Sequence, residues 1–414
     1  MGRVKKANRT YTHGIVTSFG RSPVAVDAVR GCLDDMRQHC DAAPTLVLLF
    51  GGGKLEPAVL LETLNQTLPG VPVIGGSAAG VIATSALGCT GLEVGMVAFF
   101  DPAVTPKVHA TYELLESDYE AGRQLGMSAR GTHAPASAVL LFYDSVRAFQ
   151  PRQLHLAGSV LDGFRSGWQR EALVIGGGLL TDLNLSDGWM LLDGSVRRHA
   201  AAALVFPPGV SISTEVLHAC RPVSAYMTIT RIEGAEVFEL DGDPALDVIE
   251  ERIGQPLVDS AGHPTRILTL GEKLDDPWEV GSPEDYVNRL ILTGNRSAGS
   301  VTLFEPDFSE GTMVQLMQND SQIMLDSARD GALAAMQATA EGTDPFLRLY
   351  IDCAGRVSMM SGTETEEAKV VTETLSDGVP FLGFYSGVEI APVRGISRPL
   401  DWTGVLATLR VQRS

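Results

Sequence analysis

The chain has 414 residues, which is too many for one ordinary hydrophobic core, so we expect two domains. Its 44% apolar and 20% charged residues are typical of a folded globular protein and exclude a mainly disordered one. The 32 Lys and Arg residues against 50 Asp and Glu residues give a net charge of −18, which repels phosphate backbones and anionic lipids, so nucleic acid is not an expected partner.

The sequence has no segment that predicts membrane insertion. Its basic start (Arg3, Lys5, Lys6, Arg9) resembles the beginning of a signal peptide, but no apolar stretch follows before Gly14, so we interpret it as a solvated tail. No run approaches the roughly 18 apolar residues that span a bilayer. Five dispersed cysteines without a Cys-x-x-Cys spacing are typical of reduced thiols in the cytoplasm, which is the expected location.

The first predicted element in chain order is a helix that begins at Ser22-Pro23. Ser22 is suited to the N-cap and Pro23 to the first turn, and apolar residues then recur at steps of three and four. Short apolar runs rich in β-branched residues predict buried strands after it. These strands are expected at residues 45–50, 71–74, 92–100, 138–142, 172–175 and 200–206.

The predicted elements repeat along the N-terminal half. A strand, a helix, a strand that ends in glycines, a turn-rich segment and a further strand occupy about residues 40–105 and again about 135–207. A third, looser copy lies late in the chain, where Thr363 and Glu366 predict a capping box at the start of its helix. Its strands are expected at residues 346–352, 381–383 and 405–411.

This repetition predicts a mixed fold of the α/β type, in the broad α+β sense. Duplicated strand-helix-strand units form its N-terminal half, and a related domain of layered sheet and helix follows. We place the domains at residues 1–212 and 213–414, because the second copy closes shortly before this point and a different pattern opens after it.

Two predicted strands end in glycine-rich segments, with Gly75, Gly76 and Ser77 in the first copy and Gly176 and Gly177 in the second. Glycine at a strand end allows a sharp turn and lets a ligand approach the backbone N–H groups. Neither segment has Rossmann or P-loop spacing, so nucleotide binding is not predicted. Two interpretations stay open, namely ligand contact and tight turns with close strand–helix packing.

The segment Cys353-Ala354-Gly355-Arg356 follows a predicted strand that ends at Asp352. An arginine beside a thiol favours the thiolate and can bind a carboxylate through two hydrogen bonds. The alternatives are a buried cysteine that packs as a small hydrophobe and an arginine held by Asp352 or Glu389.

The segment from Gly383 to Pro392 is unusually dense in special residues. It includes Gly383, Tyr385, Ser386 and Glu389, and strand alternation would send Tyr385 and Glu389 to the same side, into a shared cavity. The alternative is a glycine-kinked strand whose glutamate pairs with an arginine. No catalytic residue is assigned, and no metal site is predicted, because the eight histidines are scattered and His-Glu-x-x-His is absent. Gly-x-Ser-x-Gly is also absent, so a hydrolase triad is not supported.

Taken together, these segments resemble the FIST family over nearly the whole chain and in the family's order. One set is similar to the N-terminal FIST domain, at residues 45–50, 71–80, 92–100 and 172–182. Another is similar to the C-terminal FIST domain, at residues 353–356 and 383–392. The chain departs from the family pattern at Asp401-Trp402, where a more polar pair is expected. The resemblance implies a sensory module of intracellular signalling that binds small ligands such as amino acids, with relatives that bind haem and respond to nitric oxide.

Three functions follow as hypotheses. The leading one is a stand-alone receptor for an amino acid or small carboxylate, which signals to a separate protein partner because both FIST-like halves occupy the chain. The second is a haem-based sensor, which requires a His or Cys ligand to the iron. The third is an enzyme that uses Cys353 with Arg356 and Glu389, although no nearby histidine supplies a general base. The cofactor, with haem as one option, and the oligomeric state stay undetermined.

Overall fold

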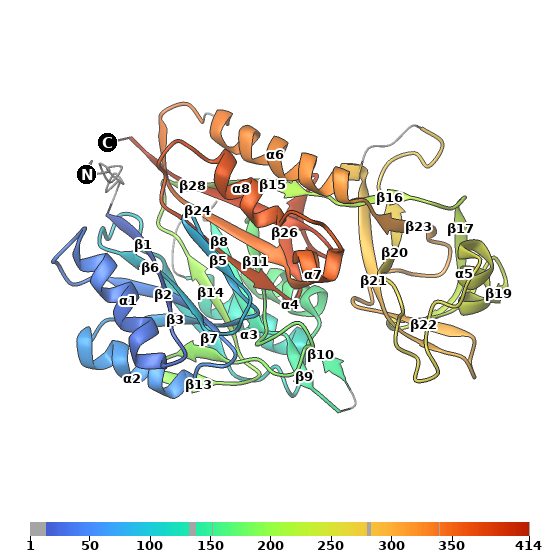
Figure 1. Ribbon diagram of the computed structural model, residues 1–414, viewed down its shortest axis with the longest axis horizontal. Coiled ribbons are helices and arrows are strands. Elements are labelled where there is room, and N and C mark those ends of the chain that lie inside the picture. Colours follow the sequence, from blue (N-terminus) through green and yellow to red (C-terminus); the bar gives the residue numbers. More distant parts are fainter. Residues whose placement is uncertain (1–13, 132–137, 151, 280–282, 339, 414) are drawn as a thin grey trace.

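The computed structural model describes residues 14–131, 138–150, 152–279, 283–338 and 340–413 (Figure 1). Within these ranges the chain forms three similar units, and a separate barrel is inserted into the third. Figure 1 shows the barrel at one end of the molecule, beside the layered body that the three units build. Every helix in the described part of the chain is too short or too polar to cross a membrane.

Each unit has the same order of elements, in which a strand, a helix, a strand, a second helix and a strand precede a hairpin and a last strand. Unit one consists of β1 (Ile15–Arg21), α1 (Ala25–Arg37), β2 (Leu46–Gly52), α2 (Pro57–Thr67), β3 (Val73–Ala78), the hairpin β4 (Val81–Ala83) and β5 (Ala86–Gly88), and β6 (Glu93–Phe99). Unit two consists of β7 (Lys107–Thr111), α3 (Asp118–Ala129), β8 (Val139–Asp144), the short pair β9 (Val146–Ala148) and β10 (Gln153–Leu154), α4 (Ala157–Trp168), β11 (Val174–Leu179), the hairpin β12 (Met190–Leu192) and β13 (Ser195–Arg197), and β14 (Ala201–Val205).

Unit three follows the same plan around the insertion. It consists of β15 (Val210–Leu217), α6 (Ser321–Gln337), β24 (Thr343–Cys353), the short helices η2 (Ala354–Arg356) and α7 (Ser358–Ser361), α8 (Glu367–Thr374), β25 (Phe381–Ser386), the hairpin β26 (Glu389–Val393) and β27 (Ile396–Leu400), and β28 (Gly404–Gln412). The mixed α/β class and the duplicated units predicted from the sequence are confirmed, and so is the looser third copy.

The three sheets of the body exchange their hairpins in a ring. Their strand orders are β1-β6-β2-β3-β12-β13, β7-β14-β8-β11-β26-β27 and β15-β28-β24-β25-β4-β5. In each sheet the two central strands joined by a helix run parallel, and the edge hairpin comes from another unit. Unit two completes the sheet of unit one, unit three completes that of unit two, and unit one completes that of unit three.

The inner faces of the three sheets meet in one apolar core. Phe50, Phe142 and Phe384 come from the three different units and contact one another at its centre. The rings of Phe50 and Phe384 stack with centroids 4.0 Å apart, and Phe142 lies edge-on to Phe50 at 5.5 Å. Such aromatic pairs add to the hydrophobic stabilisation. The three units are therefore one packed body and not three separate domains.

The inserted barrel occupies residues 220–319. Its elements are β16 (Cys220–Pro222), β17 (Met227–Glu233), β18 (Glu236–Leu240), β19 (Asp243–Pro244), α5 (Ala245–Ile253), β20 (Leu268–Lys273), η1 (Pro283–Asp285), β21 (Tyr286–Asn295), β22 (Ser300–Leu303) and β23 (Met313–Asn319). The sheet closes on itself because β23 pairs with both β17 and β20. The boundary expected between residues 212 and 213 lies inside β15, and the division into domains stays a prediction.

Helices α3 and α4 pack unusually closely because glycines line their interface. Gly122 and Gly126 of α3 face Gly163 and Gly167 of α4. A Cβ atom on Gly163 would lie 2.0 Å from the carbonyl oxygen of Tyr119, and one on Gly122 would lie 2.1 Å from that of Val160. A side chain larger than hydrogen would therefore force these two helices apart.

Two predicted helix starts are wrong. Helix α1 begins at Ala25 after Val24, and the Ser22 hydroxyl instead accepts a hydrogen bond from the N–H of Val24. Helix α8 begins at Glu367, and Thr363 contacts Ser361 rather than capping the helix. In both cases the hydroxyl group that was expected to cap the helix contacts a residue two positions away instead.

Candidate functional site

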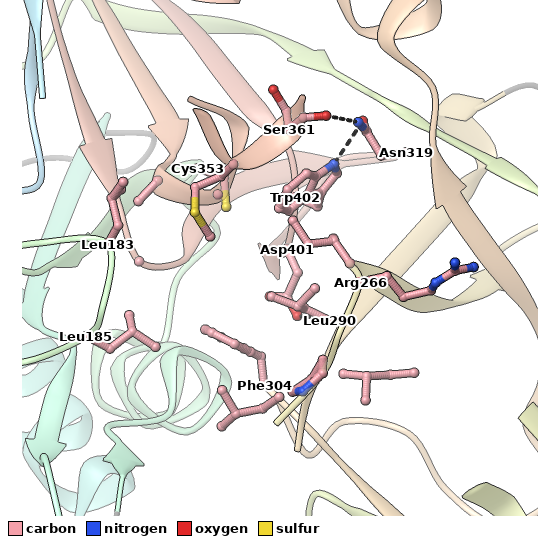
Figure 2. A pocket seen from close by; sticks show the side chains of 18 of the residues that line it. Leu183, Leu185, Arg266, Leu290, Phe304, Asn319, Cys353, Ser361, Asp401 and Trp402 are labelled. Atoms are coloured by element: carbon pink, nitrogen blue, oxygen red, sulfur yellow. Dashed lines mark hydrogen bonds between the residues drawn. The ribbon is translucent and has the colours of Figure 1, made fainter. Parts of the chain in front are cut away.

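A cavity of about 540 Å³ lies where the barrel meets units two and three (Figure 2). The barrel contributes Arg266, Leu290 and Phe304, and unit two contributes Leu183 and Leu185. Unit three closes the cavity with Cys353, Ser386, Asp401 and Trp402, among other residues. A volume of this size and a mixed apolar and polar lining are typical of sites for small organic molecules.

The strand topology places the predicted residues Cys353 and Ser386 side by side. They end the parallel strands β24 and β25 and are register partners. Ends of parallel strands are common positions for ligand contacts, because the following loops leave the sheet there. Of the predicted site residues, the cavity lining includes these two.

Trp402 joins unit three to the barrel at the cavity wall. Its indole N–H donates to the Asn319 side chain at 3.2 Å, and Asn319 donates to the carbonyl oxygen of Ser361 at 3.3 Å (Figure 2). A Cβ atom on Gly355 would lie 2.3 Å from the Trp402 ring, so glycine is required there. The glycine of the Cys-Ala-Gly-Arg segment therefore makes room for the cavity wall.

Arg356 does not face the cavity. It is fully buried and donates to both carboxylate oxygens of Glu367, lies 3.3 Å from Asp352 and donates to the Trp402 carbonyl oxygen at 2.9 Å. The protein's own groups therefore occupy its donors, and it is not available to bind a ligand carboxylate. The alternative in which Asp352 holds this arginine agrees with the structure, with Glu367 as a second partner.

Cys353 is 6% exposed and lines the cavity as a thiol. Burial, followed by the nearby carboxyl of Glu389, raises its pKa well above the ordinary value. The expectation that Arg356 would favour the thiolate is therefore wrong. The loss of water and the nearby carboxyl groups of Glu389 and Asp352 raise the pKa of this thiol. Arg356 does not offset the rise, because its charge is already paired with Glu367 and Asp352.

Tyr385 and Glu389 do not share a cavity. The chain turns at Gly387 between β25 and β26, so the alternation assumed for one extended strand breaks there. The Tyr385 hydroxyl donates to Glu366 at 2.7 Å. Glu389 accepts from the hydroxyl of Ser386 at 2.6 Å and lies just behind the cavity lining.

The predicted glycine positions lie inside the sheets. Gly75 and Gly176 pair with neighbouring parallel strands, and a Cβ atom on them would lie 1.9 and 1.7 Å from the carbonyl oxygens of Leu49 and Leu141. Gly76 and Gly177 pair with the exchanged hairpins, and Gly383 occupies the equivalent position in β25. Ser77 hydrogen-bonds the backbone of Trp189. The structure thus supports the packing interpretation at these positions.

Asp401 is a cavity residue that the sequence reasoning did not select. It is 3% exposed, and its Oδ2 accepts from the N–H of Leu290 at 2.9 Å. Burial raises its pKa to about 6, and Arg289 opposes this rise. The only sequence signal was the departure from the family pattern at Asp401-Trp402, and both residues line the cavity.

As formed by the described residues, the cavity lining contains no histidine to bind a haem iron or another metal ion. Of its lining residues, Cys353 and Met360 carry sulfur that can serve as an axial ligand, and the raised pKa of Cys353 opposes the thiolate form. Across the described residues, no cluster of three or more His, Cys, Asp or Glu side chains is arranged to hold a metal ion.

Family comparison agrees with the resemblance seen in the sequence. The FIST N domain model matches residues 45–243 and the FIST C domain model matches residues 245–392. The chain belongs to the FIST family. FIST domains are sensory domains of signal-transduction proteins.

Curated relatives of this FIST protein include two mycobacterial proteins of undescribed activity. The uncharacterized protein Rv0628c of Mycobacterium tuberculosis is 28% identical over 235 residues, which are 56% of this chain and 60% of that protein. The uncharacterized protein Mb0898c of Mycobacterium bovis is 27% identical over 204 residues, which are 48% of this chain and 51% of that protein. The chain thus matches between half and two thirds of the length of these relatives.

Solved structures show only a distant likeness to the FIST protein. A cyanuric acid hydrolase from A. caulinodans gives a TM-score of 0.37 at 10% identity, and the comparison covers 97% of this chain and 99% of that one. A chorismatase gives 0.35 at 9% identity, with 96% and 98% covered. Scores at this level establish no common fold.

Proposed function

We propose that this FIST protein is a receptor that binds a small organic molecule in the cavity between the barrel and units two and three, and signals to a separate protein partner in the cytoplasm. The observation that carries the proposal is the cavity itself, with its apolar walls and its polar groups Arg152, Arg266 and Asp401. Amino acids and small carboxylates are the ligand classes that the family resemblance implies. The sensory role of FIST domains supports the same conclusion.

The position of the cavity suggests how binding is transmitted. Its walls belong to the barrel and to the body, so a ligand that contacts both favours one placement of the barrel. The two parts are already joined by Trp402 with Asn319 and by Glu305, which accepts the N–H groups of Ala157 and Gly158 at 2.8 and 3.0 Å. A change in these contacts would move the barrel relative to the body and so alter the surface to which a partner protein binds.

A thermal-shift screen of the full chain against amino acids and small carboxylates tests the proposal. A ligand that binds the native state raises the melting temperature, because it stabilises that state by RT ln(1 + c/Kd), where c is the free ligand concentration. Leu183→Trp narrows the cavity and should abolish the shift. Leu333→Trp, on the exposed face of α6, is the matched control and should retain it. A broad panel with no shift, or a shift that L183W leaves unchanged, would contradict the proposal.

The two alternative functions gain no support from the site. A haem sensor would have no histidine ligand among the described residues that line this cavity, and an enzyme based on Cys353 would lack a thiolate and a free arginine. The receptor is therefore the function that the geometry favours.

A further inference from the structure

The polar end of the cavity is formed by a group of buried acids. Asp401 lines the cavity, while Glu389 and Glu305 lie behind it and are each nearly or fully inaccessible. Burial, with Asp401 as a further cause, raises the pKa of Glu305 to about 8. Burial and Asp401 also raise the pKa of Glu389 to about 8, against the hydrogen bond from Ser386. The charge of Asp401 therefore acts on both glutamates through a region of low dielectric constant.

Asp401 keeps one oxygen without a partner. Its Oδ2 accepts from the N–H of Leu290, but no hydrogen-bond donor among the described residues reaches Oδ1, which is itself buried. A buried carboxylate oxygen with no donor costs free energy, because the water that would solvate it is excluded. Figure 2 shows Asp401 between Trp402 and Leu290 on the cavity wall.

The nearby arginines do not complete this site. Arg289 is a buried cation whose charge acts on Asp401, but its Nε and Nη2 donate to Asp307 and the carbonyl oxygen of Pro399, and its Nη1 donates to the carbonyl oxygen of Asn288. Arg266 lines the cavity, yet its guanidinium group points away from Asp401 in Figure 2. A donor from a ligand is therefore what Oδ1 lacks.

We propose that the cavity selects a ligand with a protonated amine on an apolar body, and that the amine donates to Oδ1 of Asp401. The apolar body would lie against Leu183, Leu185 and Phe304. This inference rests on the proposed receptor function and names its ligand class. A ligand that offers only a carboxylate is disfavoured at this end of the cavity, because it would face the Asp401 carboxylate and Arg356 is occupied by Glu367 and Asp352.

Three probes of similar shape and different charge test the assignment on the full chain. These are phenethylamine, 2-phenylethanol and 3-phenylpropionate, and their affinities are measured by ligand-observed NMR and calorimetry at pH 7. Because a charge-assisted hydrogen bond in a buried site is worth more than a neutral one, phenethylamine should bind at least about tenfold more tightly than 2-phenylethanol. Asp401→Asn keeps the side-chain shape and an oxygen for the Leu290 N–H, and should remove this difference.

Asp162→Asn, at an exposed position of α4, is the control and should preserve the amine preference. A second measurement needs no variant. With Asp401 faced by Arg289, Asp307, Glu305 and Glu389, its pKa of about 6 means that lowering the pH from 7 to 5 protonates it. The affinity for phenethylamine should then fall about tenfold while that for 2-phenylethanol stays constant.

The outcomes separate the two proposals. If 3-phenylpropionate binds best, or if D401N leaves the amine preference intact, the amine assignment is overturned and the receptor function stands. If neither the three probes nor the amino acid panel binds, the receptor function fails and the amine assignment fails with it.

Discussion

Replacing Arg356 by methionine should be strongly destabilising, and increasingly so at higher pH. The side chain is fully buried between Glu367 and Asp352, which are themselves buried. Removing one partner of a buried ion pair typically costs about 3–5 kcal/mol, because the remaining charge has neither water nor a counter-ion. Here two carboxyls lose the same cation, so the upper part of this range is expected near pH 7.

The pH dependence follows from the carboxyl groups. Burial already raises the pKa of Asp352 and of Glu367, and Arg356 is the main group that opposes this rise. Without the arginine both carboxyls stay protonated in the folded state and ionise on unfolding, so the native state holds more protons. The free energy of unfolding should therefore fall with rising pH, by about 1.4 kcal/mol per pH unit for each carboxyl above its unfolded pKa.

Urea unfolding of R356M and the wild type at pH 5, 6 and 7 measures both effects. Arg329→Met is the matched control, because Arg329 pairs with Asp326 on the exposed face of α6. An exposed pair is worth about 0–1 kcal/mol, and its loss should depend little on pH in this range. The reasoning is refuted if R356M loses no more stability than R329M at pH 7, or if its loss is the same at all three pH values.

Three further predictions concern other parts of the molecule. Gly163→Ala should cost about 1–3 kcal/mol by forcing α3 from α4, whereas Gly131→Ala, which has open space at its Cβ, should change the melting temperature little; equal effects would contradict the packing argument. Cys353 should react with iodoacetamide at pH 8 at least about tenfold more slowly than the less buried Cys40, measured by peptide mass spectrometry, and faster labelling of Cys353 would show that the thiol is not protected. In the wild type, the free energy of unfolding should fall as the pH rises from about 5 to 8, because Glu305 has its pKa raised to about 8 in the folded state and ionises more readily on unfolding. Glu305→Gln should remove this fall, and an unchanged pH profile of stability would count against the argument.

The sequence predicted the local elements well, because strands and helices leave short-range patterns. The strand, helix and glycine-ended strand of each unit were identified, including the weaker third copy near Phe346. Gly75 and Gly176 were recognised as special, but the same residue type serves a turn, a ligand or a close strand contact. The close approach of the carbonyl oxygens of Leu49 and Leu141 to these glycines, which supports the role in strand contact, is visible only in the folded structure.

The site was only partly predictable, because its walls are remote in sequence. Cys353 and Ser386 line the cavity, since both end strands of one unit, and their contact with a ligand stays a prediction. Arg356 was assigned to a ligand because its true partner, Glu367, was not considered, and Asp401 was missed because its role depends on the barrel residue Leu290. The contact between Asp401 and Leu290, which are 111 positions apart, has no local signature.

The ring of exchanged hairpins also constrains how the chain reaches its folded state. Strand β4 of unit one pairs with β25 of unit three, so Ala83 can pair with Leu382 only after about 300 further residues have been synthesised. Until then the early hairpin and the unit-three position that it fills both keep unpaired strand edges, which are exposed to association with other chains. The sheet of unit one has all its strands once β13 is made, whereas the sheets of units two and three are completed only by the last strands to leave the ribosome.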